Sequence, residues 1–272
     1  MSIANLDPVR SAKAAWFVRR DTGAPHDALA GLLRLLGIEG ASPDTATCVA
    51  TRRVRAGTAL LHEAARAQAV HFIAVGTFKL VHTAEDGYEQ VLGFAGRSEM
   101  LGYDAVSKGE HPTTAIALED STVFAIAIDD LFALGARIPA LGRALHTAAS
   151  RQLLRQIEIA RLMAAVSADV RLARFLLQLS DHMAEHGQSA RRLYLRMSRR
   201  DIASHLGVAH ETVSRSFGAL AACGCVRVDN REVEIVDRER LAACASNTRG
   251  LTDVRRIASP VRARPGQHAA CA

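Results

Sequence analysis

Short apolar segments separated by turn residues fill the chain between about Thr47 and Ile128. Several of them alternate apolar and polar residues, as in Thr77-Phe-Lys-Leu-Val-His82, and glycines punctuate the stretch that follows. Alternation of this kind turns one face of a strand towards a core and the other towards solvent. Strands this short and evenly spaced predict a β-sandwich or jelly roll.

A longer apolar period follows this β-rich stretch. Pro139 suits a first helical turn, and a helix is expected over Pro139–Val166 because apolar residues recur at four-residue steps. Its stripe contains Leu145, Ala149, Leu153 and Ile157, widened by Leu154 and Met163. The stripe could pack on the helix's own domain or against a second subunit. Upstream, the leucines between Leu29 and Leu36 predict a short helix that ends at Gly37.

The segment after Val166 has helix–turn–helix spacing. Ser167–Asp169 is typical of a hinge and N-cap, and Val170–Met183 is amphipathic. Ser198 with Asp201 three residues later resembles a capping box, which would begin a helix that buries Ile202, Ala203 and Leu206. Gly207 allows a tight turn, and Val208 would fill the angle before the next helix.

The helix predicted from about His210 carries side chains suited to base edges. Its inner face would be Val213, Phe217 and Leu220, and its outer face Glu211, Ser214 and Arg215. Arg can donate to guanine O6 and N7, Glu can accept from cytosine N4, and Ser can do either. An ordinary Glu211–Arg215 ion pair within the helix is the alternative.

An alternating hairpin follows this helix. Val226–Val228 and Val233–Ile235 are the expected strands, and Asp229-Asn230 is the expected two-residue turn. A hairpin directly after a recognition helix makes a winged helix.

Composition and charge support a nucleic-acid partner. The 272 residues are 49% hydrophobic, which is enough to bury a core and excludes a disordered chain. The net charge of +6 arises in the C-terminal third, since residues 187–231 hold eight Lys or Arg against three Asp or Glu. Residues 1–186 are near neutral, with 19 basic against 20 acidic side chains. A basic domain behind a neutral one indicates a sensor joined to a nucleic-acid binder. The helix–turn–helix spacing makes double-stranded DNA the expected partner.

Nothing in the sequence indicates a membrane or an oxidising compartment. The longest stretch without Lys, Arg, Asp or Glu is Ala67–Phe78, too short for a span of about 18 apolar residues. The N-terminus lacks the apolar region of a signal peptide, and five cysteines do not form a disulfide pattern. We therefore expect a cytoplasmic protein with no membrane contact.

Residues Leu206-Gly-Val-Ala-His-Glu-Thr-Val-Ser-Arg215 resemble the recognition motif of the CRP/FNR superfamily of bacterial transcription regulators. The Glu-x-x-Ser-Arg form is similar to the FNR branch, because the cyclic-AMP-receptor branch usually has Gly at the Ser214 position. The resemblance covers roughly residues 45–245. Further FNR-like stretches are 87–94, 100–105, 111–120 and 167–177.

This resemblance implies a homodimeric, non-enzymatic regulator, with activation at some promoters. It implies a palindromic site similar to TTGAT–ATCAA, with Ser214 towards thymine and Glu211 and Arg215 towards the G·C pair. It also implies contact with RNA polymerase through loops such as Thr83–Glu89. The residues expected to touch DNA are Ser198, Arg199, His210, Glu211, Thr212, Ser214 and Arg215.

Departures from the family pattern concern the sensed signal. The oxygen-sensing FNR type holds an iron–sulfur cluster with closely spaced N-terminal cysteines and one cysteine in the β-roll. Here Cys48 is the only cysteine before residue 200, and Phe124 stands at the β-roll position. One thiolate cannot supply four ligands, so a 4Fe–4S cluster is not expected.

Cyclic AMP is not expected either. The cyclic-AMP-receptor branch has an Arg that binds the nucleotide phosphate near the position of Pro112-Thr-Thr114, and no Arg stands there in this chain. Glu99 does lie near the position of the family's ribose-contacting Glu. Ala209 replaces the usual Thr or Ser N-cap of the recognition helix, a loss that typically costs about 0.5–2 kcal/mol.

Other clusters leave alternatives open. Haem or metal binding by His62, His71, His82 and His111, or gas and redox sensing through haem or Cys48, is possible within the class. Cys223, Cys225 and Cys244 could form a zinc site or thiol switch, but buried small residues are the simpler interpretation. A cupin-like metalloprotein with an accessory winged helix is the alternative outside the class. No catalytic arrangement stands out.

The predicted fold class is therefore α+β, with a double-stranded β-helix (jelly roll) of the cyclic-nucleotide-binding type before a winged helix-turn-helix. The expected divisions are an N-terminal extension (1–45), a β-roll sensor (46–136), a dimerisation helix (137–166), a DNA-binding domain (167–245) and a disordered basic tail (246–272).

Overall fold

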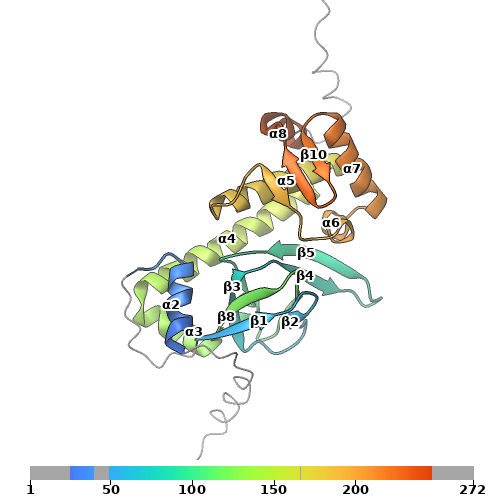
Figure 1. The fold of residues 1–272 in the computed structure, drawn as a ribbon. Coiled ribbons are helices and arrows are strands. Elements are labelled where there is room, and N and C mark those ends of the chain that lie inside the picture. Colours follow the sequence, from blue (N-terminus) through green and yellow to red (C-terminus); the bar gives the residue numbers. More distant parts are fainter. Residues whose placement is uncertain (1–24, 40–48, 166, 247–272) are drawn as a thin grey trace, which may run out of the picture. The chain divides into compact units, whose positions relative to one another are not determined.

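Antiparallel strands form the first half of the structure, as the alternating sequence predicted. The computed structural model describes residues 25–39, 49–165 and 167–246 (Figure 1). They divide into two compact units: residues up to Ile159 with Arg196–His205, and Ala160–Leu195 with Leu206 onwards. The predicted tail and Cys48 lie outside the described residues.

Two four-stranded sheets make the β-roll of the first unit. Sheet A has the order β1-β8-β3-β6, and sheet B has the order β2-β7-β4-β5. All of the pairings within them are antiparallel. The strands are β1 (Val49–Val54), β2 (Ala59–Leu61), β3 (Ala69–Val75), β4 (Phe78–Thr83), β5 (Glu89–Ala95), β6 (Met100–Leu101), β7 (Thr114–Ala117) and β8 (Ser121–Ala127).

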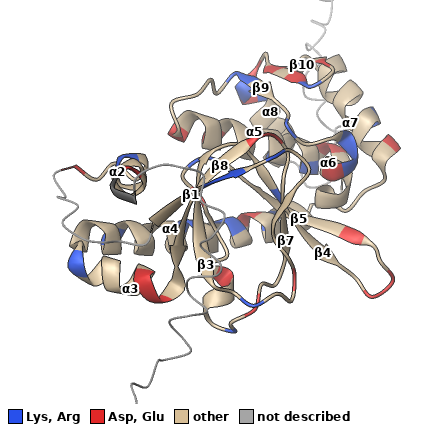
Figure 2. Ribbon diagram, turned by 60° about the horizontal axis from the view of Figure 1, so that its bottom comes forward, with Lys and Arg blue, Asp and Glu red and all other residues tan. Residues whose placement is uncertain are grey.

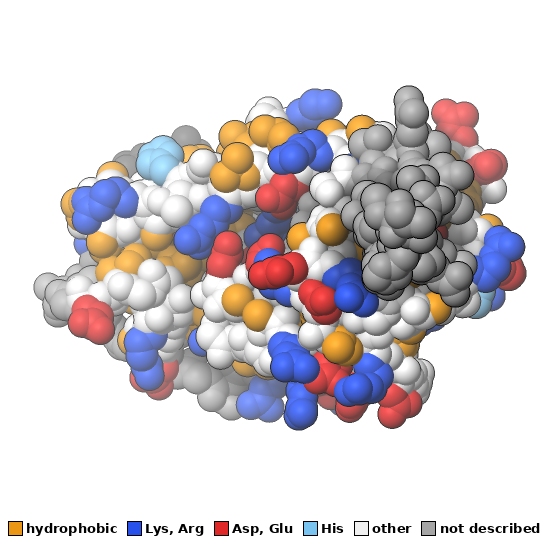
Figure 3. Space-filling model, turned by 90° about the horizontal axis from the view of Figure 1, so that it is seen from above, with side chains coloured by type: hydrophobic (Ala, Val, Ile, Leu, Met, Phe, Trp, Pro, Cys, Tyr) orange, Lys and Arg blue, Asp and Glu red, His pale blue; other side chains and the backbone are white. Residues whose placement is uncertain are grey.

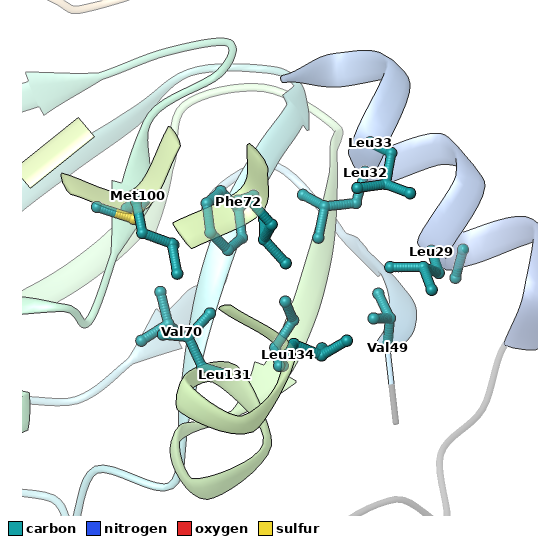
Figure 4. Packing of buried hydrophobic residues seen from close by; sticks show 13 residues of the cluster. Leu29, Leu32, Leu33, Val49, Val70, Phe72, Met100, Leu131 and Leu134 are labelled. Atoms are coloured by element: carbon teal, nitrogen blue, oxygen red, sulfur yellow. The ribbon is translucent and has the colours of Figure 1, made fainter. Parts of the chain in front are cut away.

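Sheet A is covered by helices on its outer face. Helix α2 (Pro25–Leu35), α3 (Ile128–Arg137) and the start of α4 (Pro139–Met163) meet strands β1, β3 and β8 there. Leu29, Leu32 and Leu33 of α2 turn towards the strands (Figure 4). Phe72 is fully buried in this cluster. A buried side chain of this size contributes about 1.5–3 kcal/mol, so this outer cluster stabilises the unit substantially.

The inner face of sheet A packs on sheet B. Alternation along β3 places Phe72 in the outer cluster and Ile73 in the inner one, together with Phe78 of β4 and Val123 of β8. His71 lies on the same face of its strand as Ile73 and is 2% exposed. The Arg52 guanidinium on β1 donates to Nε2 of His71 over 3.4 Å.

Close backbone approaches need glycine at two places. Gly76 has φ +107°, and a Cβ added there would lie 2.0 Å from Oγ of Ser121. Gly142 of α4 faces Gly135 of α3, since a Cβ at Gly142 would lie 2.9 Å from the Gly135 carbonyl oxygen. A larger residue at Gly76 would force the backbone there away from Ser121 of β8, and a larger residue at Gly142 would force α4 away from α3.

The second unit is built around α5 (Ala168–Glu185). Helices α7 (His210–Ala222) and α8 (Arg238–Ser246) both pack on α5. A three-stranded antiparallel sheet has the order β10-β11-β9, with β9 at Arg192–Tyr194, β10 at Val226–Asp229 and β11 at Glu232–Ile235. A short helix, α6 (Arg199–Leu206), precedes α7 in the chain.

Most predicted elements are confirmed, with shifts at their ends. The long helix ends at Met163 rather than Val166, and the hairpin turn is Asn230-Arg231 rather than Asp229-Asn230, because Asp229 pairs with Glu232. Asn230 has φ +50°, a conformation that Asn adopts more readily than most residues. Helices α3 and α8 and strand β9 were not predicted. No helix among the described residues is long and apolar enough to cross a membrane.

Acid should destabilise the β-roll through His71. Burial, aided by Arg52 and His111, lowers the pKa of His71 from 6.5 to about 3. Below pH 6.5 the unfolded chain therefore binds a proton at His71, whereas the folded chain does not bind it until the pH approaches 3. The unfolding free energy that is present above pH 6.5 is lost as the pH falls. This linkage removes about 2 kcal/mol of unfolding free energy between pH 7 and pH 5.

Denaturant unfolding at pH 7 and pH 5 measures this loss. His71→Gln keeps an uncharged acceptor, so we expect it to reduce the difference between the two pH values by about 2 kcal/mol. His62→Gln, at an exposed position, is the control and should leave the difference as in wild type. An unchanged difference in His71→Gln would show that other groups cause the acid sensitivity.

Candidate DNA-binding site

The first helix of the predicted motif begins with a reciprocal cap. The Ser198 hydroxyl donates to Oδ2 of Asp201 over 2.6 Å, and the Asp201 backbone N–H donates to Oγ of Ser198 over 3.1 Å. The Ser198 backbone N–H also donates to Oδ2 of Asp201, over 2.9 Å. These bonds satisfy free N–H groups at the start of α6, as in a capping box. The Ser198 hydroxyl therefore already has an intramolecular partner.

Asp201 also receives a hydrogen bond from Lys79 of β4, over 2.8 Å within the first unit. Burial alone would raise the pKa of Asp201, but the bonds from Lys79 and Ser198 outweigh it and keep the pKa below its ordinary value. Ser204 accepts from the Val91 backbone N–H over 2.9 Å. Sequence reasoning missed Lys79 and Ser204, because contacts more than 100 residues apart leave no local signal.

The turn before the recognition helix has the expected form. Gly207 has φ +62°, and Val208 is half-buried. Ala209 is the N-cap of α7 and makes no side-chain cap hydrogen bond. Its carbonyl oxygen accepts from the backbone N–H groups of Thr212 and Val213, so the first turn forms without a capping side chain.

Helix α7 separates its buried and exposed faces as predicted. Val213, Phe217 and Leu220 are buried, whereas Glu211, Ser214 and Arg215 are exposed. Nη2 of Arg215 donates to Oγ1 of Thr212 over 3.1 Å, and Ser214 donates to the His210 carbonyl oxygen over 3.4 Å. No ion pair is found between Glu211 and Arg215 in the described part of the chain, where the Arg215 guanidinium turns to Thr212 instead.

Two arginines on α5 anchor the ends of neighbouring helices. Arg171 donates to the Leu206 carbonyl oxygen at the end of α6 over 2.8 Å and to that of Ala165 over 2.9 Å. Arg174 donates to the Ala245 carbonyl oxygen of α8 over 2.8 Å and to that of Arg161 over 2.7 Å. The sequence placed both arginines on the polar face of α5, but only the structure shows that they bind free helix-terminal carbonyls.

The hairpin after α7 has charge pairs across its sheet. Glu234 of β11 forms ion pairs with Arg227 of β10, over 2.5 Å, and with Arg191, over 3.2 Å. These pairs are largely exposed, so each contributes little to stability. Of the remaining predicted DNA contacts, His210 is exposed, whereas Arg199 is half-buried and burial lowers its pKa.

Charges of both signs are interspersed on the molecule. On the face drawn in Figure 3, acidic and basic side chains lie next to one another, with hydrophobic side chains between them. That face is therefore not uniformly basic.

Two cysteines of the second unit, Cys225 and Cys244, lie side by side in its core. Cys225 and Cys244 are buried, with 3.7 Å between their Sγ atoms. Burial raises the pKa of Cys225 to about 12, and burial also raises the pKa of Cys244. Both are therefore thiols, not thiolates, at neutral pH. No group of three or more His, Cys, Asp or Glu in the described segments is placed to hold a metal ion.

Three residues of the β-roll bear on its possible ligands. Glu99 is 8% exposed and forms an ion pair with Arg155 of α4, and the Gly96 backbone N–H donates to it over 2.8 Å. The Thr114 hydroxyl accepts from the Glu63 backbone N–H over 3.0 Å. Phe124 packs on α2, where a Cβ added at Gly31 would lie 2.7 Å from its ring.

Known proteins match both halves of the chain. Residues 51–137 match the cyclic nucleotide-binding domain, and residues 170–244 match the Crp-like helix-turn-helix domain. The chain is 33% identical over 185 residues to the transcriptional regulatory protein btr of Bordetella pertussis, covering 68% of this chain and 76% of that protein. It is 32% identical over 198 residues to the fumarate and nitrate reduction regulatory protein of Salmonella typhimurium, covering 73% and 79%.

The fold is shared with a solved structure. FixK2 from Bradyrhizobium japonicum superposes with a TM-score of 0.66 at 24% identity, covering 73% of this chain and 98% of that chain. These relatives are transcription regulators and not enzymes, which removes the cupin-like alternative. The α+β order of β-roll, long helix and winged helix-turn-helix, together with these identities, shows that the chain belongs to the CRP/FNR family of DNA-binding transcription regulators.

Proposed function

We propose that two copies of this chain bind a TTGAT–ATCAA palindrome and that Glu211, Ser214 and Arg215 read its bases. The observation that carries the proposal is the exposed face of α7, where Glu211 and Arg215 lie one turn apart without binding each other. A carboxylate and a guanidinium that were paired would have to separate before they could meet bases. Here neither side chain is held by the other.

The chemistry of these side chains fits one G·C pair in each half-site. The Arg215 guanidinium suits guanine O6 and N7, and the Glu211 carboxylate suits the N4 amino group of the paired cytosine. Ser214 is small enough to approach a thymine. Their position in the first two turns of α7 is the part of a recognition helix that enters the major groove.

An exposed apolar stripe on α4 supports a dimer. Leu153 is 69% exposed, and Leu154 and Ile157 are each 57% exposed. Leu153 and Ile157 are four residues apart and therefore share a face of the helix. Burying these side chains against the same helix of a second copy would remove them from water. The resulting twofold symmetry matches a palindrome whose half-sites lie about 34 Å apart.

The hairpin between β4 and β5 is the proposed contact for RNA polymerase, which makes the protein an activator at some promoters. Its tip is acidic, as the red colour in Figure 2 shows, and Glu85, Asp86 and Tyr88 are exposed there. A bond between the Ala84 N–H and the Tyr88 carbonyl oxygen closes the turn, and Gly87 supplies φ +82°.

Neither a 4Fe–4S cluster nor cyclic AMP is part of the proposed sensor. Phe124 contributes a packed ring where a cluster would need a thiolate. Glu99 is engaged by Arg155 and by the Gly96 backbone N–H, and the Thr114 hydroxyl accepts from the Glu63 backbone N–H, so both side chains have roles within the β-roll itself. Haem and Cys48 remain open as the source of a signal, and the cytoplasmic location remains a prediction.

Replacing Arg215 with Ala should abolish sequence-specific binding. The lost bidentate contact is worth about 1–3 kcal/mol per half-site, and a dimer loses it twice. Footprinting on a TTGAT–ATCAA duplex measures this, with Arg227→Ala on β10 as the control that removes an arginine outside α7. If the Arg215→Ala footprint equals that of wild type, α7 does not read the site as proposed.

Ile157→Lys should convert the dimer to a monomer. A charged side chain at the centre of an apolar contact is costly to bury without a partner. Light scattering after size exclusion reports the mass, and Glu158→Lys introduces the same residue at the neighbouring exposed position. A dimer that survives Ile157→Lys at micromolar concentration would place the interface elsewhere.

Protein purified without oxygen should contain no stoichiometric iron and sulfide. Iron analysis with an absorption spectrum between 300 and 700 nm tests this on the full chain. Cluster absorption in that range would contradict the proposal, and a sharp haem band would instead support the haem alternative.

A further inference from the structure

Arg215 has two possible partners on the preceding turn of α7. Thr212 lies three residues before it and Glu211 four residues before it, and both positions are neighbours on a helix surface. Side chains on a helix lean towards its N-terminus, so the guanidinium passes over this turn. In the structure Nη2 of Arg215 donates to Oγ1 of Thr212 over 3.1 Å and makes no pair with Glu211.

The competing Glu211–Arg215 pair is physically reasonable. An i,i+4 pair of opposite charge is worth about 0.3–0.5 kcal/mol on an exposed helix. A hydrogen bond to a hydroxyl is worth a similar or somewhat larger amount, and Thr212 is half-buried, so its hydroxyl is better fixed than the exposed carboxylate. The Thr212 hydroxyl therefore competes with the Glu211 carboxylate for the guanidinium, and in the structure the guanidinium binds the hydroxyl.

We infer that Thr212 is a positioning residue that determines specificity at the G·C pair. Its hydroxyl fixes the direction of Arg215 and keeps Arg215 from neutralising Glu211. Glu211 and Arg215 are then already apart when the protein meets DNA, and less side-chain conformational entropy is lost on binding. This inference rests on the proposed function, because it assigns a role within the same reading surface.

The test compares Thr212→Val with Thr212→Ser in the full-length protein. Val has nearly the shape of Thr but no hydroxyl, whereas Ser keeps the hydroxyl. Fluorescence anisotropy would measure affinity for three duplexes: the TTGAT palindrome, one with TTAAT half-sites, and one with CTGAT half-sites. Thermal unfolding of each variant would show that the fold is kept.

We expect Thr212→Val to reduce the preference for TTGAT over TTAAT by about 30-fold, because each of the two subunits loses one hydrogen bond of about 1 kcal/mol. Its preference for TTGAT over CTGAT should stay within about twofold of wild type, because Ser214 is held separately by the His210 carbonyl oxygen. Thr212→Ser should keep both preferences.

Two results would overturn the inference. An equal loss of affinity for all three duplexes would show that Thr212 contacts the DNA backbone, and an unchanged preference would show that its hydroxyl does not direct Arg215. A wild-type protein that fails to prefer TTGAT over TTAAT would instead refute the proposed function itself. The experiment therefore distinguishes failure of the Thr212 inference from failure of the proposed function.

Discussion

Burial of sheet A on both faces is the constraint on which the first unit depends. Side chains alternate along β3, so Phe72 packs under α2 and α3 while Ile73 packs towards sheet B. A one-residue shift in register would exchange the two faces of the strand, and His71 would then lie in the cluster that the helices cover. The outer layer in turn sets where α4 begins, because Leu141 and Leu145 belong to the same cluster. The exposed apolar stripe lies on the part of α4 that follows these buried leucines.

In the proposed DNA-binding part of the chain, polar side chains hold the ends of the helices in place. Arg171 and Arg174 bind carbonyl oxygens at helix ends, and the Ser198–Asp201 cap satisfies the start of α6. Ala209 offers no cap to α7, so the backbone and the buried Val213 and Phe217 position that helix. The proposed readers Glu211, Ser214 and Arg215 are exposed, and other residues fix the helix that carries them.

Much of the candidate site was predictable because its signals are local. The spacing of Glu211, Ser214 and Arg215 needs only the period of a helix, and the capping box at Ser198 needs only a partner three residues later in the chain. Three features were not predictable for the opposite reason. The partner of Arg215, the Lys79 bond to Asp201 and the Arg155 bond to Glu99 depend on side-chain directions or on residues brought together from distant strands and helices.

The sequence by itself determined the kind of protein: a β-roll, a long helix and a winged helix-turn-helix, each recognisable from its own hydrophobic period and turn residues. It also determined which side chains α7 exposes. Only the tertiary structure decided that Phe124 packs against α2, that Glu99 is neutralised by α4, and that Arg215 turns to Thr212 and not to Glu211. The physical reason is that periodicity fixes the face on which a residue lies, whereas its partner is chosen by competition among all the groups that folding brings within reach.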